Sequence, residues 1–129
     1  MHPNILKMLD ERNLVSVMNR TKWERLAQAI TQKSELEPTV RMQELGEEEP
    51  RGFSLLDWTF SEFNPALIEW IDIDPIKRKR AGGLVPDIET DVSAYILDAL
   101  KNSNVPYSME DGMYRVWGYY EPASAPNFV

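Results

Sequence analysis

Two aspartates stand two positions apart in the segment 66–83, which reads ALIEWIDIDPIKRKRAGG. Because side chains alternate along a strand, Asp72 and Asp74 would share one face, and Asp57 or Glu62 could add a third oxygen ligand for Mg²⁺. Hard-cation sites need more ligands than this stretch supplies, so we expect acids at a strand end that are solvated or pair with the cations at 77–80, and no bound metal. A metal-dependent hydrolase or phosphate-binding enzyme that uses Asp57, Asp72 and Asp74 is the alternative.

Glu69 falls on the other face of the same stretch, in a row with Ile71 and Ile73. A carboxylate on a core-facing row is costly unless it is paired. Arg115, embedded among apolar residues of the last predicted strand, is its natural partner. We therefore predict a structural pair of Glu69 and Arg115 across neighbouring strands, and a catalytic acid with a raised pKa is the second interpretation.

Four consecutive cations follow, namely Lys77, Arg78, Lys79 and Arg80. Between acidic flanks such a run is typical of a solvated loop. Two other interpretations stay open: an anion-binding role for the four side chains, and an intramolecular pairing with the glutamates at 47–49. The run is too short and isolated to predict a nucleic-acid channel.

A protein-binding patch is the third kind of site that the sequence suggests. Glu47, Glu48 and Glu49 lie in the loop-like stretch GEEEPRG, and Trp58 and Trp70 lie in predicted strands. Most aromatic side chains will be core, but a tryptophan left exposed beside an acidic loop would anchor a partner. These five residues form the candidate surface for a protein partner.

Composition narrows the chemistry further. The 129-residue chain has no cysteine and one histidine, at position 2, so Cys-containing zinc sites and Ser-His or Cys-His catalytic pairs cannot be built. No nucleotide-binding, serine-hydrolase or zinc-protease motif occurs. The net charge of −7 disfavours nucleic acid as a partner. We expect no cofactor and incline against an enzyme.

Length and hydropathy bound the organisation of the chain. Its length fits one domain, 1–129, in which residues 1–9 and 121–129 are loosely ordered. The N-terminal stretch is charged and lacks the apolar segment of a signal peptide, and no window approaches about 18 uninterrupted apolar residues. We therefore expect a cytoplasmic protein without a membrane partner.

Helical periodicity appears in three places. Apolar residues recur at helical spacing over 21–33, where Thr21 and Glu24 fit the capping-box pattern. A shorter helix is expected from Asp10 to Asn19, whose last residue would take the left-handed conformation. A third helix is expected near 91–102, with its apolar residues on one face.

The remaining chain is typical of strands. We expect a largely antiparallel sheet of about five strands, near 38–45, 53–60, 67–73, 105–109 and 113–120. The last two would form a hairpin around Gly112. The predicted fold class is therefore α+β, with N-terminal helices and the helix near 91–102 packed on the sheet.

Three stretches carry a family resemblance: VMNRTKWERL, LIEWIDI and ILDALKNSNVPYSMEDGMYRVWGYY. They resemble an uncharacterised family of small bacterial proteins, a domain of unknown function, and the resemblance implies no activity or catalytic residue. More loosely, a small acidic chain is similar to toxin-immunity proteins, because an acidic face can steer onto a basic toxin. We therefore expect a non-enzymatic interaction protein whose partner is a basic toxin or a similar protein. A homodimer through an exposed sheet edge is the other expected association.

Overall fold

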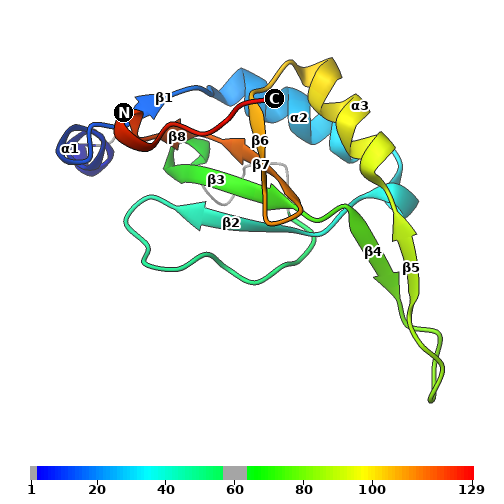
Figure 1. The fold of residues 1–129 in the computed structure, drawn as a ribbon. Coiled ribbons are helices and arrows are strands. Elements are labelled where there is room, and N and C mark those ends of the chain that lie inside the picture. Colours follow the sequence, from blue (N-terminus) through cyan, green and yellow to red (C-terminus); the bar gives the residue numbers. More distant parts are fainter. Residues whose placement is uncertain (1–2, 57–63) are drawn as a thin grey trace.

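A four-stranded antiparallel sheet forms the centre of the molecule, and helices α2 and α3 cover one of its faces (Figure 1). The computed structural model describes residues 3–56 and 64–129. The strand order is β2-β3-β7-β6, with β2 Val40–Glu44, β3 Ile68–Ile73, β7 Met113–Trp117 and β6 Tyr107–Glu110. The helices are α2 Arg20–Ile30 and α3 Ser93–Ser103. This arrangement confirms the predicted α+β class.

Smaller elements surround this sheet. One ribbon pairs β1 Val15–Ser16 with β8 Tyr119–Tyr120, and another pairs β4 Ile76–Lys79 with β5 Ile88–Asp91. The other elements are α1 Pro3–Glu11 and the short 3₁₀ helices η1 Ser34–Leu36, η2 Pro65–Leu67 and η3 Pro122–Ser124. Within the described ranges, no helix has the length and apolar character needed to cross a bilayer.

Alternation along the strands separates the two faces of the main sheet. On the helix-covered face, the register aligns Ile71 of β3 with Met42 and Val116. These side chains share one core with apolar residues of α2 and α3, among them Trp23, Leu26, Ile30, Ile96 and Leu100. The opposite face carries polar and aromatic side chains, and it holds the predicted acidic cluster.

The N-terminal helix lies earlier in the chain than predicted. α1 ends at Glu11, and Asn13 takes the left-handed conformation, with φ 53°, which directs the chain into β1. The expected helix from Asp10 to Asn19 is therefore wrong, because β1 within that range pairs with β8. Leu14 packs against a second apolar cluster that contains Ile5, Leu45 and Tyr119.

Asn19 caps α2 in place of the predicted capping box. Its backbone is extended, with φ −139° and ψ 174°, and its side-chain oxygen accepts a hydrogen bond of 2.8 Å from the N–H of Lys22. Thr21 and Glu24 lie inside the helix, which begins at Arg20, so the box prediction is wrong.

Asn19→Ala is expected to lower the free energy of unfolding by about 1 kcal/mol, because the first turn of α2 loses an acceptor for one of its free N–H groups. Thr21→Ala is the matched control, with an expected change within about 0.5 kcal/mol. Urea unfolding followed by circular dichroism compares the two variants, and equal losses would contradict the assignment of Asn19 as the cap.

The predicted strand near 53–60 is represented by a single bridge in the described residues. Ser54 and Val40 exchange two backbone hydrogen bonds, of 2.8 and 2.9 Å, which cover the outer edge of β2. Residues 57–60 lie outside the described part of the chain. The other four predicted strands correspond to β2, β3, β6 and β7, and β8 continues the last of them after Gly118.

The cations at 77–80, predicted to lie in a solvated loop, belong to a β-hairpin instead. β4 and β5 pair antiparallel, and the register places Arg78 opposite Glu89. The loop prediction for the cations at 77–79 is therefore wrong, because residues 76–79 pair with residues 88–91 and Arg78 meets the opposite charge of Glu89 across the ribbon. The hairpin projects from the end of the main sheet (Figure 1). We call residues 76–91 the arm.

Candidate functional site

Asp72, the centre of the predicted acidic cluster, is fully buried between two guanidinium groups, so the expectation of a solvated acid is wrong at this position. Its Oδ1 accepts from Arg115 Nε at 2.6 Å, and its Oδ2 accepts from Arg115 Nη2 at 2.9 Å and Arg41 Nε at 3.0 Å. Strand register produces this contact, because Arg41 on β2 and Arg115 on β7 both lie opposite Asp72 on β3. The carboxylate oxygens are engaged by the protein itself, which favours a structural role.

Asp74 is engaged in a similar way at the start of the arm. Its Oδ1 accepts from the N–H of Ile76 at 2.9 Å, and its Oδ2 lies 3.4 Å from Nη1 of Arg78. Asp57 and Glu62, which the metal hypothesis also uses, lie outside the described residues. In the part of the chain that the structure describes, no group of three or more His, Cys, Asp or Glu side chains could hold a metal ion. The geometry therefore gives no support to the hydrolase alternative.

The predicted pair of Glu69 and Arg115 is wrong, because each residue has another partner. Arg12 lies 2.5 Å from Oε1 of Glu69 and 2.6 Å from Oε1 of Glu121. The hydrogen bonds to Glu69 and then to Glu121 raise the pKa of Arg12. The physical reason is the alternation of the strand: Asp72, three positions after Glu69, lies opposite Arg115.

Aromatic rings stack on the two arginines of this face. The guanidinium carbon of Arg115 lies 3.7 Å from the ring centroid of Trp70, and that of Arg41 lies 5.1 Å from the ring centroid of Phe53. Trp70 is 9% exposed, so little of its ring can reach a protein partner. Trp58, the other predicted anchor, lies outside the described residues. The proposed tryptophan surface therefore gains no support from Trp70.

The tip of the arm exposes three large apolar side chains together. Leu84 is 105% exposed, Val85 62% and Ile88 55%. Sequence reasoning missed them because the stretch AGGLVPDI has no periodicity and reads as an ordinary loop. Their common position becomes visible once the flanking strands are paired.

The four predicted anion-binding residues divide into two pairs. Lys77 donates to the backbone carbonyl oxygen of Glu37, and Arg78 lies 3.5 Å from Glu89 of the opposite strand. Lys79 and Arg80 are exposed and form no ion pair with any described residue. The two unpaired cations are the pair next to the apolar tip.

The acidic loop, residues 46–56, presents the predicted glutamates at 47–49 to solvent. Gln43 fixes its start, since its side-chain amide donates to the carbonyl oxygen of Glu47 at 2.6 Å. A hollow of about 300 Å³ lies beside the glutamates and is lined by Met42, Glu44, Glu47, Glu49, Pro50 and Arg51. Further along the loop, Phe53 is 39% and Leu55 62% exposed. The loop thus presents both negative charge and apolar surface.

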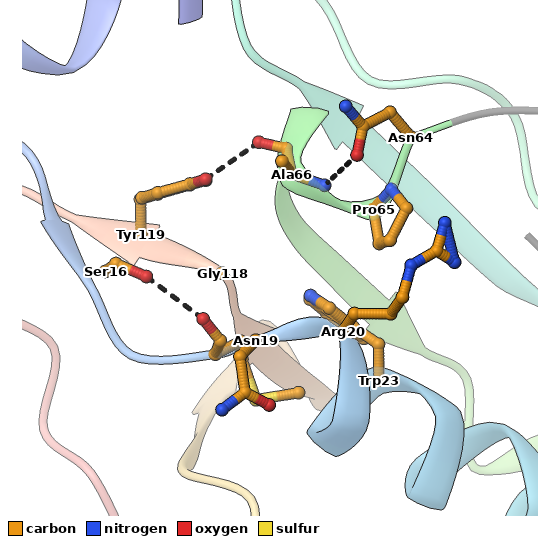
Figure 2. A pocket seen from close by; sticks show the side chains of 10 residues that line it. Ser16, Asn19, Arg20, Trp23, Asn64, Pro65, Ala66, Gly118 and Tyr119 are labelled. Atoms are coloured by element: carbon orange, nitrogen blue, oxygen red, sulfur yellow. Dashed lines mark hydrogen bonds between the residues drawn. The ribbon is translucent and has the colours of Figure 1, made fainter. Parts of the chain in front are cut away.

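A separate cavity of about 260 Å³ lies between the start of α2, η2 and the β1–β8 ribbon (Figure 2). The hydroxyl of Tyr119 donates to the carbonyl oxygen of Ala66 at 2.8 Å, and burial raises the pKa of Tyr119. Arg20 is the one charged residue among the described residues that line it, so these walls offer no acid–base pair. Sequence reasoning missed this cavity because its walls come from three distant segments.

Comparison with known proteins gives one match. A family model described as "Family of unknown function (DUF6678)" matches residues 5–123. No curated protein and no solved structure matches the chain.

Proposed function

We propose that this chain, which belongs to the DUF6678 family of unknown function, is a protein-binding module whose arm contacts the partner. The exposure of Leu84, Val85 and Ile88 carries this proposal. Full burial of an aliphatic side chain of this size contributes about 1.5–3 kcal/mol, so three such side chains at one tip favour association.

The position of the apolar tip supports binding. A two-stranded hairpin alone in water is marginally stable, and the arm projects from the sheet with solvent on both sides of its tip (Figure 1). A partner that covers the tip would both bury apolar area and hold the hairpin. Exposed apolar groups with polar neighbours are typical of interaction sites.

The charge of the molecule favours a protein over a lipid surface. Lys79 and Arg80 would attract anionic lipid, but Glu89 and Asp91 lie on β5, the other strand of the arm, and Asp87 directly precedes it. The whole chain carries a net charge of −7, which opposes approach to an anionic membrane. A protein surface can match this mixed pattern, whereas an anionic bilayer cannot.

Leu84→Ser combined with Val85→Ser is expected to abolish partner binding while the free energy of unfolding changes by no more than about 0.5 kcal/mol, because both side chains are solvent-exposed. A photo-crosslinking amino acid at position 85 provides the measurement in source cells. We expect a discrete protein adduct that disappears when Leu84 is also replaced by Ser. The same crosslinker at Leu6, an apolar residue of α1 that is 53% exposed, is the control.

Two results would overturn this proposal. One is the absence of any adduct specific to position 85. The other is sedimentation of the purified protein with vesicles of anionic phospholipid that depends on Leu84 and Val85, which would make the arm a lipid-binding element.

Neutralisation of a basic toxin is a second candidate function. The exposed glutamates at 47–49 support it, because an acidic surface increases the association rate with a basic protein. In that case Glu47→Lys with Glu49→Lys would weaken toxin binding, and changes at the tip of the arm would leave it unaltered.

A further inference from the structure

The arm and the acidic loop have complementary surfaces. On the arm, Arg80 precedes the apolar Leu84 by four residues, and on the loop Glu49 precedes the apolar Phe53 by four residues. All four side chains are exposed. The arm therefore exposes cations close to apolar side chains, and the acidic loop exposes anions and, further along, an apolar side chain.

The charged groups on both sides are available for an intermolecular contact. Lys79 and Arg80 form no ion pair with the described residues, and the glutamates at 47–49 form none either. Glu44, next to the hollow, is already paired with Arg51. An intermolecular contact between these cations and these anions would pair opposite charges, and Leu84 and Val85 beside the cations would exclude water from it.

The arm cannot make this contact within its own chain. β2 begins beside the base of the arm, where the N–H of Asp74 donates to the carbonyl oxygen of Thr39 at 3.0 Å. It ends at Glu44, and the glutamates of the acidic loop follow at that far end of the sheet. The arm projects away from this end (Figure 1). The intramolecular pairing considered from the sequence is therefore excluded for Lys79 and Arg80.

We propose that the arm of one molecule binds the acidic loop of a second copy of the same chain. This inference rests on the proposed protein-binding function and names the partner. In a two-fold dimer the contact occurs twice, with each arm on the loop of the other copy. Each contact then needs to supply only half of the roughly 1,600 Å² that a standard protein interface buries.

Charge exchange between the two surfaces provides the test. Variant A carries Lys79→Glu and Arg80→Glu, and variant B carries Glu47→Lys and Glu49→Lys. Sedimentation velocity over a range of concentrations should show a dimer for the wild type. Variants A and B alone should each associate at least about tenfold more weakly, because like charges meet at the contact.

The mixture of variants A and B is the decisive sample. The acidic arm of A then meets the basic loop of B, and the basic arm of B meets the acidic loop of A. Association should therefore return in the mixture, and added salt should weaken it, because both contacts are exposed to solvent. Lys33→Glu with Lys101→Glu changes the net charge as variant A does, at exposed positions elsewhere, and should leave the dimer intact.

Three results would overturn the inference: a monomeric wild type, unchanged association of variant B, or a mixture that stays monomeric. The proposed function has a separate outcome. If the wild type is monomeric but position 85 still crosslinks to a different protein, the arm is a binding element and only its assignment to a second copy fails. If variant B loses binding to a basic protein, the acidic loop serves the toxin-type function instead.

Discussion

Asp72→Ala is expected to lower the free energy of unfolding by about 3–5 kcal/mol, because it leaves two guanidinium groups without their shared anion. Asp72 has no solvent-accessible surface, and the side chains of Arg41 and Arg115 are 30% and 16% exposed. Stacking on Trp70 holds the guanidinium of Arg115 in place, so it cannot readily turn to solvent. Urea unfolding followed by tryptophan fluorescence measures the loss.

Two further substitutions separate charge from shape at this position. Asp72→Asn keeps the size of the side chain but removes the charge, and we expect it to lose most of the same stability. Asp98→Ala, at an exposed position of α3, is the control and should change the free energy of unfolding by less than about 0.5 kcal/mol. Equal effects of Asp72→Ala and Asp98→Ala would mean that the buried ion pairs contribute nothing net.

The pairing of Asp72 illustrates what the sequence can and cannot predict. The alternation of side chains along a strand predicts that Glu69 and Asp72 lie on different faces. The sequence also predicts a carboxylate–arginine pair across neighbouring strands. It does not predict which of the two meets Arg115, because both rows contain apolar residues and the register between β3 and β7 depends on contacts far apart in the chain. Arg12 contacts Glu69 from the N-terminal segment, and no sequence pattern around Arg12 indicates that partner.

The arm shows a different limit. Residues 75–90 contain prolines, glycines and a run of charges, all of which are typical of a loop. Two four-residue strands pair there, with Arg78 opposite Glu89, and a pattern search within one segment does not detect such a contact between strands. The acidic loop, by contrast, was predictable, since its charge, proline and glycines all indicate exposure. One half of the proposed interface was therefore visible in the sequence and the other half was not.

Gly118→Ala is expected to destabilise the protein by more than about 3 kcal/mol, because a new Cβ has no room at this position. An ideal Cβ on Gly118 would lie 2.1 Å from the carbonyl oxygen of Ile68. The backbone cannot move away without loss, since the N–H of Gly118 donates to the carbonyl oxygen of Glu69 at 2.8 Å and its carbonyl oxygen accepts from Val17 at 3.0 Å.

The consequence of this close contact is topological. Gly118 lies between β7, in the main sheet, and β8, which pairs with β1. The chain therefore crosses from the main sheet to the ribbon at a position where only glycine fits. Gly52→Ala is the matched control: its Cβ would have no neighbour within 4 Å, and the expected change is within about 1 kcal/mol. Thermal unfolding of both variants decides the point, since a Gly118→Ala protein as stable as Gly52→Ala would show that β3 and β7 do not approach as closely as this packing requires.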